Sequence, residues 1–329
     1  MTQIWTITSK RAHAALRTAT AWVACSLIGL ANPAFAATFD WGSAETVSPG
    51  IKYVRYVAST ADGFSPRNNL ISCLQIDTTT PNLHFFTTPR MHPWVSGSSE
   101  TTSQTTCDFV RTSQRSDKKV VVAINGGSWE PFNSSTWNRS MSSDVTGLQI
   151  SSGILVSPPD GSNPSFVVDK RGFPDFVASV VAGADVSQYQ TAITGWIGFC
   201  LENGQRASRP ANDSLHPRTA IGISKDKRHV YFMTIDGRRN TSIFNSAPIS
   251  AGVYLNEVGD YLRFFGAYDG LNMDGGGSTT MARWNADTGE AELLNLPTGS
   301  GRTYYGAKSW AERATGNNIG VYYRGTTTR

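Results

Sequence analysis

Apolar residues in this chain occur mostly in short runs that are separated by glycine, proline, asparagine and aspartate. Runs of this length, rich in β-branched and aromatic residues, predict β-strands, and a run interrupted by turn residues predicts a hairpin. Single strands are predicted over residues 51–58, 70–76, 119–124, 165–169, 176–181, 218–224, 229–235, 268–273 and 318–324, and hairpins over 148–156 and 279–296. The chain is therefore expected to be rich in strands.

Two segments have helical character. Residues 250–265 repeat apolar side chains at helical spacing, with Ser250 as a suitable N-cap and Gly266 as a stop signal. Residues 101–114 form the second segment. With few helices among many strands, the pattern predicts an α+β fold: a single domain with a large mixed, mostly antiparallel β-sheet core and a few packed helices.

The first 36 residues have the pattern of a secretory signal peptide. Basic residues precede an apolar run over 19–30, and an Ala-Phe-Ala segment at 34–36 offers a cleavage site. The apolar run is too short to favour a retained membrane anchor. We therefore expect residues 37–329 to form the catalytic domain of an exported protein, periplasmic or secreted, with no stable membrane span after cleavage.

The charge balance argues against a nucleic-acid partner. The formal net charge is +4, but three of the 29 basic residues and none of the 25 acidic ones lie in the signal segment. The other 26 basic and 25 acidic residues nearly cancel, and the basic ones form no clustered stripe. A nearly neutral chain has no electrostatic reason to bind nucleic acid.

Cysteine usage leaves the redox chemistry open. Cys25 lies in the signal segment, so Cys73, Cys107 and Cys200 face the oxidising compartment. An odd number permits at most one intrachain disulfide, and Cys73 with Cys107 is the favoured pair. The alternative is that all three are small buried apolar residues. Because there is no Cys-x-x-Cys, no zinc site is predicted.

Three predicted strands end in an asparagine or aspartate that is followed by glycine. Glycine allows a tight turn and leaves backbone N–H groups uncovered, so such turns can point donors at an anion. The turns are Asn125-Gly126-Gly127, Asp236-Gly237-Arg238 and Asp274-Gly275-Gly276-Gly277-Ser278. A plain β-turn explains one glycine but explains three in succession badly. Serine-hydrolase, zinc-hydrolase and P-loop motifs are absent from the sequence, which argues against those classes.

These turns, in this order and together with Pro217-Arg218-Thr219-Ala220-Ile221-Gly222, resemble the phosphodiester glycosidase family over residues 51–323. The resemblance implies a glycoside hydrolase that cleaves the bond between an anomeric sugar carbon and a phosphodiester, of the N-acetylglucosamine-1-phosphodiester type. It implies catalytic roles for Asp236, Asp274, Arg218 and Glu312, and substrate-binding roles for Asn125, Gly126, Arg238, Gly275, Gly276, Gly277, Ser278 and Arg313.

The chemistry of the bond is consistent with these residue types. A phosphodiester leaves as a weakly basic anion, so a general acid matters less than in ordinary glycoside hydrolysis. Arg218 or Arg238 can bind phosphate oxygens with a forked guanidinium. Asp236 and Asp274 are candidates for a nucleophile or for a base that activates water, and Glu312 is a third carboxylate candidate. The choice between retention and inversion stays open, because it depends on the separation of the carboxylates.

Several further expectations concern ligands. Trp129, Trp137, Trp196 and Tyr304 are aromatic residues that could stack on sugar rings. Ca²⁺ at Asp236 or Asp274 would suit its preference for oxygen ligands, but the sequence lacks a closely spaced acidic cluster, so neither a metal nor another cofactor is predicted. The alternatives to the phosphodiester glycosidase are a glycosidase or lyase acting on a non-phosphorylated exopolysaccharide, and a non-catalytic carbohydrate-binding envelope protein.

Overall fold

The computed structural model describes residues 38–58, 67–131, 139–208, 214–238, 250–299 and 312–325. All of them belong to one compact unit. The predicted signal segment, residues 1–36, lies outside the described residues, as do Trp137 and Tyr304. Among the residues that are described, no helix is long and apolar enough to cross a membrane.

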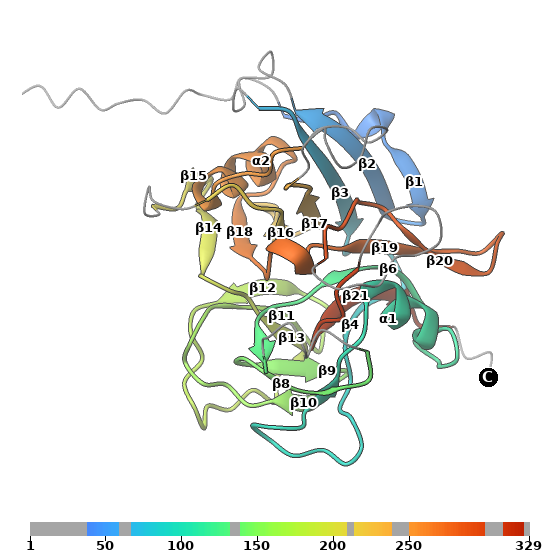
Figure 1. Ribbon diagram of the computed structural model, residues 1–329, viewed down its shortest axis with the longest axis vertical. Helices are drawn as coiled ribbons and strands as arrows, with labels where there is room; N and C mark the ends of the chain where they lie inside the picture. The colour runs from blue at the N-terminus through green and yellow to red at the C-terminus, as the bar shows by residue number, and fades with distance from the viewer. Residues whose placement is uncertain are drawn as a thin grey trace, which may run out of the picture. The chain divides into compact units, whose positions relative to one another are not determined.

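The described strands form four sheets (Figure 1). In spatial order, the eight-stranded sheet contains β1 (Glu45–Ser48), β2 (Ile51–Ala58), β3 (Asn69–Asp77), β17 (His229–Ile235), β16 (Arg218–Ile223), β18 (Asp269–Asn272), β14 (Phe199–Glu202) and β15 (Gln205–Arg206). One five-stranded sheet contains β20 (Glu290–Leu293), β19 (Met281–Asn285), β6 (Val120–Asn125), β21 (Asn318–Tyr323) and β4 (Leu83–Thr87). The other contains β10 (Ile154–Ser157), β9 (Gln149–Ser151), β13 (Tyr189–Thr194), β11 (Ser165–Asp169) and β12 (Pro174–Val177). The three-stranded sheet contains β5 (Thr101–Thr102), β8 (Ser142–Val145) and β7 (Trp129–Glu130).

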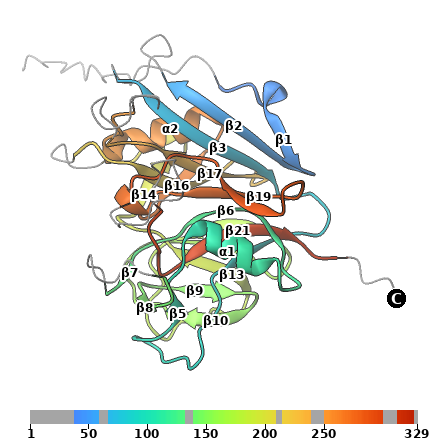
Figure 2. The same cartoon turned by 45° about the vertical axis from the view of Figure 1, so that its right-hand side comes forward.

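The sheet-rich prediction is confirmed, but the expectation of one large mixed sheet is wrong. Within the described part of the chain every strand pairing is antiparallel, and the strands divide among four sheets. The strands divide into several sheets because more than one sheet packs against the same hydrophobic core. Phe232 of β17, Ile124 of β6 and Phe166 of β11 belong to one buried cluster, so three different sheets contribute a face to it. Figure 2 shows these layers, with β17 above β6 and β13 below.

The two α-helices pack on outer faces of the sheets. α2 (Val258–Phe264) places Tyr261 in a second buried cluster, on the face of the eight-stranded sheet away from the main core. α1 (Thr106–Ser113), inside the helical segment predicted over 101–114, packs through Phe109 against the β6 and β19 sheet. Single-turn 3₁₀-helices are η1 (Trp41–Ser43), η3 (Leu255–Glu257) and η4 (Gly276–Ser278).

The helix predicted over 250–265 begins later than its apolar spacing suggested. Regular helical structure starts only at η3, because Ser250 is not an N-cap. Its hydroxyl donates to the Asp236 carbonyl at 2.6 Å, which joins this segment to the end of β17. Gly252 then has a φ of +88°, which lies outside the right-handed helical region.

The favoured Cys73–Cys107 disulfide is wrong. Cys73, Cys107 and Cys200 are all buried, and none of them forms a disulfide with another. Cys73 and Cys200 lie in the cluster under α2, whereas Cys107 lies in α1 in a separate cluster. The cysteines therefore act as small buried residues, which is the alternative that the sequence left open.

Candidate active site

The asparagine and aspartate turns meet at the ends of β6, β16 and β18. The Asn125 side-chain amide donates to the Asp274 carbonyl at 2.8 Å, and its oxygen accepts from the Thr219 hydroxyl at 2.8 Å. The Asp274 N–H in turn donates to the Gly126 carbonyl at 3.1 Å. Asn125 is fully buried. Its polar atoms therefore hold the backbone of Asp274 in place.

The glycines of the Asp274 turn let two guanidinium groups approach the backbone. Gly276 has a φ of +60°, and a Cβ added there would lie 3.1 Å from Nη2 of Arg238. A Cβ on Gly277 would lie only 2.4 Å from Nη2 of Arg313. Any side chain at these positions would displace an arginine. This close approach is a physical reason for a run of glycines that a simple turn does not need.

Asp274 carries a buried carboxyl group with an unused oxygen. The residue is 4% exposed, and its Oδ2 has no hydrogen-bond partner among the described residues. Burial raises the pKa of Asp274 to about 6, while the Ser278 hydroxyl, the Arg313 charge and the Gly275 N–H act to lower it. The group can therefore change protonation state near neutral pH, which is typical of a reacting carboxyl.

Arg313 supplies positive charge beside this carboxyl, and Arg238 lies against Gly276 of the same turn. Nη1 of Arg313 donates to the Ser278 hydroxyl oxygen at 3.2 Å. Burial lowers the pKa of Arg313 to about 10, the Asp274 charge opposes that shift, and the Arg238 charge adds to it. Arg238 is exposed, and its Nη2 lies 3.1 Å from Nδ1 of His216. One buried carboxyl and two guanidinium groups can thus face a ligand that carries both a reactive carbon and an anion.

A sequence model of the phosphodiester glycosidase family matches residues 118–322, which is more than half of the chain. The chain belongs to the phosphodiester glycosidase family. The matched range includes Asn125, Arg218, Asp236, Asp274 and Arg313. The resemblance inferred from the turn motifs is therefore confirmed, and membership of this family supports glycosidase activity.

Solved structures with a similar fold come from an animal and from bacteria. The catalytic domain of zebrafish N-acetylglucosamine-1-phosphodiester alpha-N-acetylglucosaminidase, auto-inhibited by its pro-peptide, has a TM-score of 0.60 at 18% identity, covering 88% of this chain and 87% of that one. A hypothetical protein from Synechocystis has a TM-score of 0.52 at 14% identity, covering 84% and 62%. A putative exported protein from Burkholderia pseudomallei K96243 has a TM-score of 0.51 at 14% identity, covering 78% and 74%. No curated protein matches the sequence. At these identities the structural likeness shows a shared fold.

Asp236, the other aspartate of the family motifs, has hydrogen-bond partners on both carboxylate oxygens. Oδ1 accepts from the Asn295 amide at 3.0 Å and from the Leu296 N–H at 3.1 Å, and Oδ2 also accepts from Leu296 at 3.1 Å. Asn295 further donates to the Thr279 carbonyl. These contacts connect the end of β17 to the segment after β20 and favour a structural use of the charge.

Arg218 is also held by the backbone. It is 5% exposed, its Nε donates to the Val253 carbonyl at 3.3 Å, and its Nη2 donates to the Ser214 carbonyl at 3.2 Å. The neighbouring Pro217 carbonyl accepts from Gly276 N–H at 2.8 Å. Arg218 therefore borders the Asp274 turn, with part of its donor capacity committed to the segments around it.

Glu312 faces α1. Its Oε1 accepts from the Cys107 N–H at 3.0 Å, in the first turn of the helix. Burial raises the pKa of Glu312 to about 7; the Asp108 charge adds to the shift, and hydrogen bonds from Cys107 and the Arg139 charge oppose it. A carboxylate at a helix N-terminus satisfies free N–H groups. The adjacent Arg313 reaches Ser278 instead, so the two neighbours contact different elements.

Sequence reasoning missed Asn295, which holds Asp236, and Asn317 beside the Asn125 turn. Asn317 is fully buried, and neither polar atom of its side chain has a partner in the described part of the structure. Its Oδ1 would lie 2.3 Å from a Cβ added to Gly126. The sequence signal was weak, because Asn317 merely precedes the last strand. His216 becomes relevant through its contact with Arg238.

The two described aromatic residues that were considered for sugar contact differ in exposure. Trp129 is 1% exposed and is among the largest fully buried side chains, so it belongs to the core. Trp196 is 39% exposed, and its backbone N–H donates to the Asn272 carbonyl, two residues before Asp274. Trp196 is therefore an exposed residue whose backbone lies near the turn. No group of three or more His, Cys, Asp or Glu side chains in the described ranges is arranged to hold a metal ion.

Proposed function

We propose that this family member hydrolyses the bond between the anomeric carbon of a sugar and a phosphodiester. The observation that carries the proposal is the buried Asp274 carboxyl, with one oxygen unpartnered among the described residues, with Arg313 beside it and with Arg238 against Gly276 of the same turn. A substrate of this kind presents a carbon that becomes positively charged and an anion that departs. One carboxylate and two guanidinium groups complement both charges.

The leaving group explains why one carboxyl at this turn is enough. A phosphodiester departs with the electron pair of the broken C–O bond and needs no protonation at neutral pH, so no general acid is required. Arg238 and Arg313 stabilise its negative charge, with Arg313 oriented by Ser278.

Asp274 acts on the anomeric carbon in its ionised form. It takes the proton of a water molecule whose oxygen bonds to that carbon, or it attacks the carbon itself and is released by water in a second step. In both routes the products are a free sugar and a phosphate ester. The anomeric configuration of the first sugar released, read by ¹H NMR, separates the routes: inversion indicates the first and retention the second.

The name of the zebrafish structural neighbour suggests the first sugar to test. That protein is an N-acetylglucosamine-1-phosphodiester alpha-N-acetylglucosaminidase. We therefore propose an N-acetylglucosamine-1-phosphodiester as substrate class for this chain. The assay compares release of the sugar from UDP-N-acetylglucosamine with release from an aryl glycoside of the same sugar. Preference for the phosphodiester supports the proposal, and equal or better cleavage of the aryl glycoside contradicts it.

We also propose that the chain is exported. The support is the basic and apolar pattern of residues 1–36 with its Ala-Phe-Ala segment, and the putative exported protein among the structures of similar fold. N-terminal sequencing of the protein recovered outside the cytoplasm should begin at Ala37. An intact N-terminus in the cytoplasmic fraction alone would contradict this expectation.

A further inference from the structure

A polar pocket lies at the turn between β11 and β12, where the β3–β4 connection, β4 and the end of β21 also meet. Its volume is about 240 Å³, which is enough for one sugar unit or one phosphate with its water. The side chains with donors that line it include Asn82, His84, Lys170, Gln190 and Arg324.

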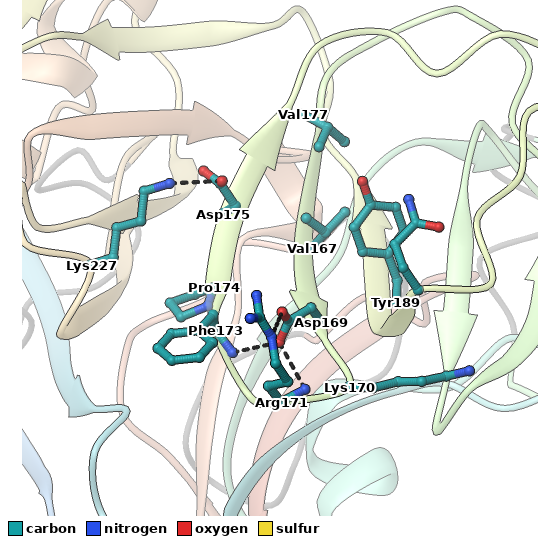
Figure 3. A pocket seen from close by; sticks show the side chains of 11 residues that line it. Val167, Asp169, Lys170, Arg171, Phe173, Pro174, Asp175, Val177, Tyr189 and Lys227 are labelled. Carbon is teal, nitrogen blue, oxygen red and sulfur yellow. Dashed lines mark hydrogen bonds and ion pairs between the residues drawn. The ribbon is translucent and has the colours of Figure 1, made fainter.

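Two cations of this pocket make no direct ion pair with the described residues, although Lys170 lies within electrostatic range of Asp185 and Arg324 within range of Asp117. Lys170 and Arg324 have no ion pair and no side-chain hydrogen bond with any residue that the structure describes. Arg171, which also lines the pocket, differs, because its Nε lies 2.9 Å from Oδ2 of Asp169. Figure 3 shows Arg171 folded onto Asp169 while Lys170 extends away from both. The pocket thus keeps two positive charges available for a ligand.

The neighbouring amides add uncharged donors. The side chains of Asn82 and Gln190 make no hydrogen bond within the described residues. The Arg324 N–H donates to the Asn82 carbonyl at 2.9 Å, which fixes the backbone of these two residues next to each other. Uncommitted amides beside uncommitted cations are suited to the oxygen atoms of an anion.

This pocket is separate from the candidate active site. β21 begins at Asn318, which pairs with Asn125, and ends at Tyr323, which pairs with Leu83 near the pocket. At about 3.3 Å per residue, the two ends of that strand are roughly 17 Å apart. A ligand in the pocket would therefore lie well away from Asp274.

The same turn borders a larger groove with apolar walls. The groove has a volume of about 740 Å³, and Val167, Val177 and Tyr189 line it together with Phe173, which is 60% exposed (Figure 3). Exposed aromatic rings bind the apolar faces of sugars. A glycan at the turn would find an anion pocket and an aromatic surface close together.

We propose that the Lys170–Arg324 pocket is a second, non-catalytic binding site for an anionic group of a glycan, either a phosphate or a carboxylate. That the ligand is a glycan rests on the proposed function, whereas the preference for an anion rests on the pocket itself. Such a site would hold a polymeric substrate on the enzyme without taking part in bond cleavage.

The test measures binding to the mature chain by isothermal titration calorimetry. Glucose-1-phosphate and a galacturonate oligomer are the phosphate and carboxylate probes, and a neutral malto-oligosaccharide is the uncharged control. We expect at least one anionic probe to bind, and K170A/R324A to weaken that binding roughly tenfold or more. The matched variant R115A/K225A removes the same charge outside the pocket and should bind like the wild type.

Two further readouts separate this proposal from the proposed function. D274N should keep the anionic probe bound, and K170A/R324A should cleave a small sugar-1-phosphodiester at the wild-type rate. The proposal is overturned if no anionic probe binds, if the neutral oligosaccharide binds as well, or if both double variants lose binding equally. Loss of activity in D274N with intact probe binding leaves the pocket supported whatever the substrate proves to be.

Discussion

Asp236 and Asp274 begin from nearly the same local sequence and end in different environments. Each comes after a buried strand and precedes a glycine. Yet the oxygens of Asp236 all accept hydrogen bonds from the Asn295–Leu296 segment, while Oδ2 of Asp274 has no partner in the described structure. An Asp-Gly motif therefore predicts the turn, whereas the role of the carboxylate depends on the groups that the rest of the fold supplies.

The two turns also differ in the residues after the aspartate. Asp236 precedes a single glycine and then Arg238, which turns back towards His216. After Asp274 the glycines bring Arg238 and Arg313 against the backbone. Among the described residues, the Asp274 turn therefore has two arginines against its glycines, and one of them, Arg313, acts on the buried carboxyl. Variants at both turns can test whether this difference separates a reacting group from a structural one.

The largest effect is expected for D274N. The substitution keeps the size of the side chain but removes the charge, so turnover of a sugar-1-phosphodiester should fall by about 10³-fold, within the usual range for a lost acid–base group. Unfolding should be unchanged or shifted to higher temperature, because an amide costs less to bury than a carboxylate. Steady-state kinetics and thermal unfolding measure both quantities.

Glu312 provides the matched control, since it is a second buried carboxyl whose pKa is raised by burial, to about 7. Its contact is with the first turn of α1. E312Q should therefore retain activity close to that of the wild type. If E312Q lost as much turnover as D274N, Glu312 would join the reaction and the distinction between the carboxyl groups would fail.

The next effect is expected for G277A. The added methyl group would lie 2.4 Å from Nη2 of Arg313, which is the mobile end of a side chain, so the guanidinium should move while the fold is kept. A displacement of about 1 Å can lower kcat/KM roughly 10²-fold. Steady-state kinetics measure the loss of kcat/KM, and circular dichroism checks that the fold is kept. G325A, at a glycine just after β21 with open space around it and no positive φ, is the control and should leave activity unchanged.

The turns were predictable because their signal is local, whereas their partners were not. Glycine runs and strand ends can be read from neighbouring residues, whereas the contact of Asn125 with the Asp274 turn is seen only in the structure. The Asn295 contact with Asp236 comes from a distant hairpin and has no local signature. The family pattern pointed to Arg313, but its approach to Gly277 is visible only in three dimensions.

The same limit applies to the fold. β13 was not predicted, because polar threonines interrupt its apolar positions. In the structure Thr191 and Thr194 are buried and donate to the Phe85 and Leu148 carbonyls at 2.9 and 3.1 Å. A polar residue that finds a carbonyl in the next sheet can lie in a core strand. The carbonyl groups that accept from these threonines cannot be recognised in the sequence. The prediction therefore missed β13 and the division of the strands into several sheets.

A smaller effect, on stability, is expected for D236N. An amide nitrogen would replace one of the oxygens that accept from Leu296 and Asn295, leaving buried donors without acceptors. We expect a loss of roughly 2 kcal/mol in the free energy of unfolding, measured by urea denaturation. The folded fraction should keep its turnover within tenfold. A fall in turnover as large as that of D274N, with normal stability, would show that Asp236 also reacts.

The smallest effect, and the most specific, concerns pH. The pKa of Asp274 is about 6 and is kept from rising further by the Arg313 charge. If the ionised carboxylate reacts, kcat/KM rises with pH through about 6, since this parameter reports the pKa of the free enzyme. R313Q removes a positive charge that favours ionisation, so the pKa of Asp274 rises. The rise of kcat/KM then moves to higher pH by roughly one unit. D236N leaves Arg313 in place, so it should not change the pH at which kcat/KM rises. If kcat/KM fell with rising pH instead, Asp274 would act by donating a proton. Asp274 would then be a general acid, while Asp236 would still be a structural carboxylate.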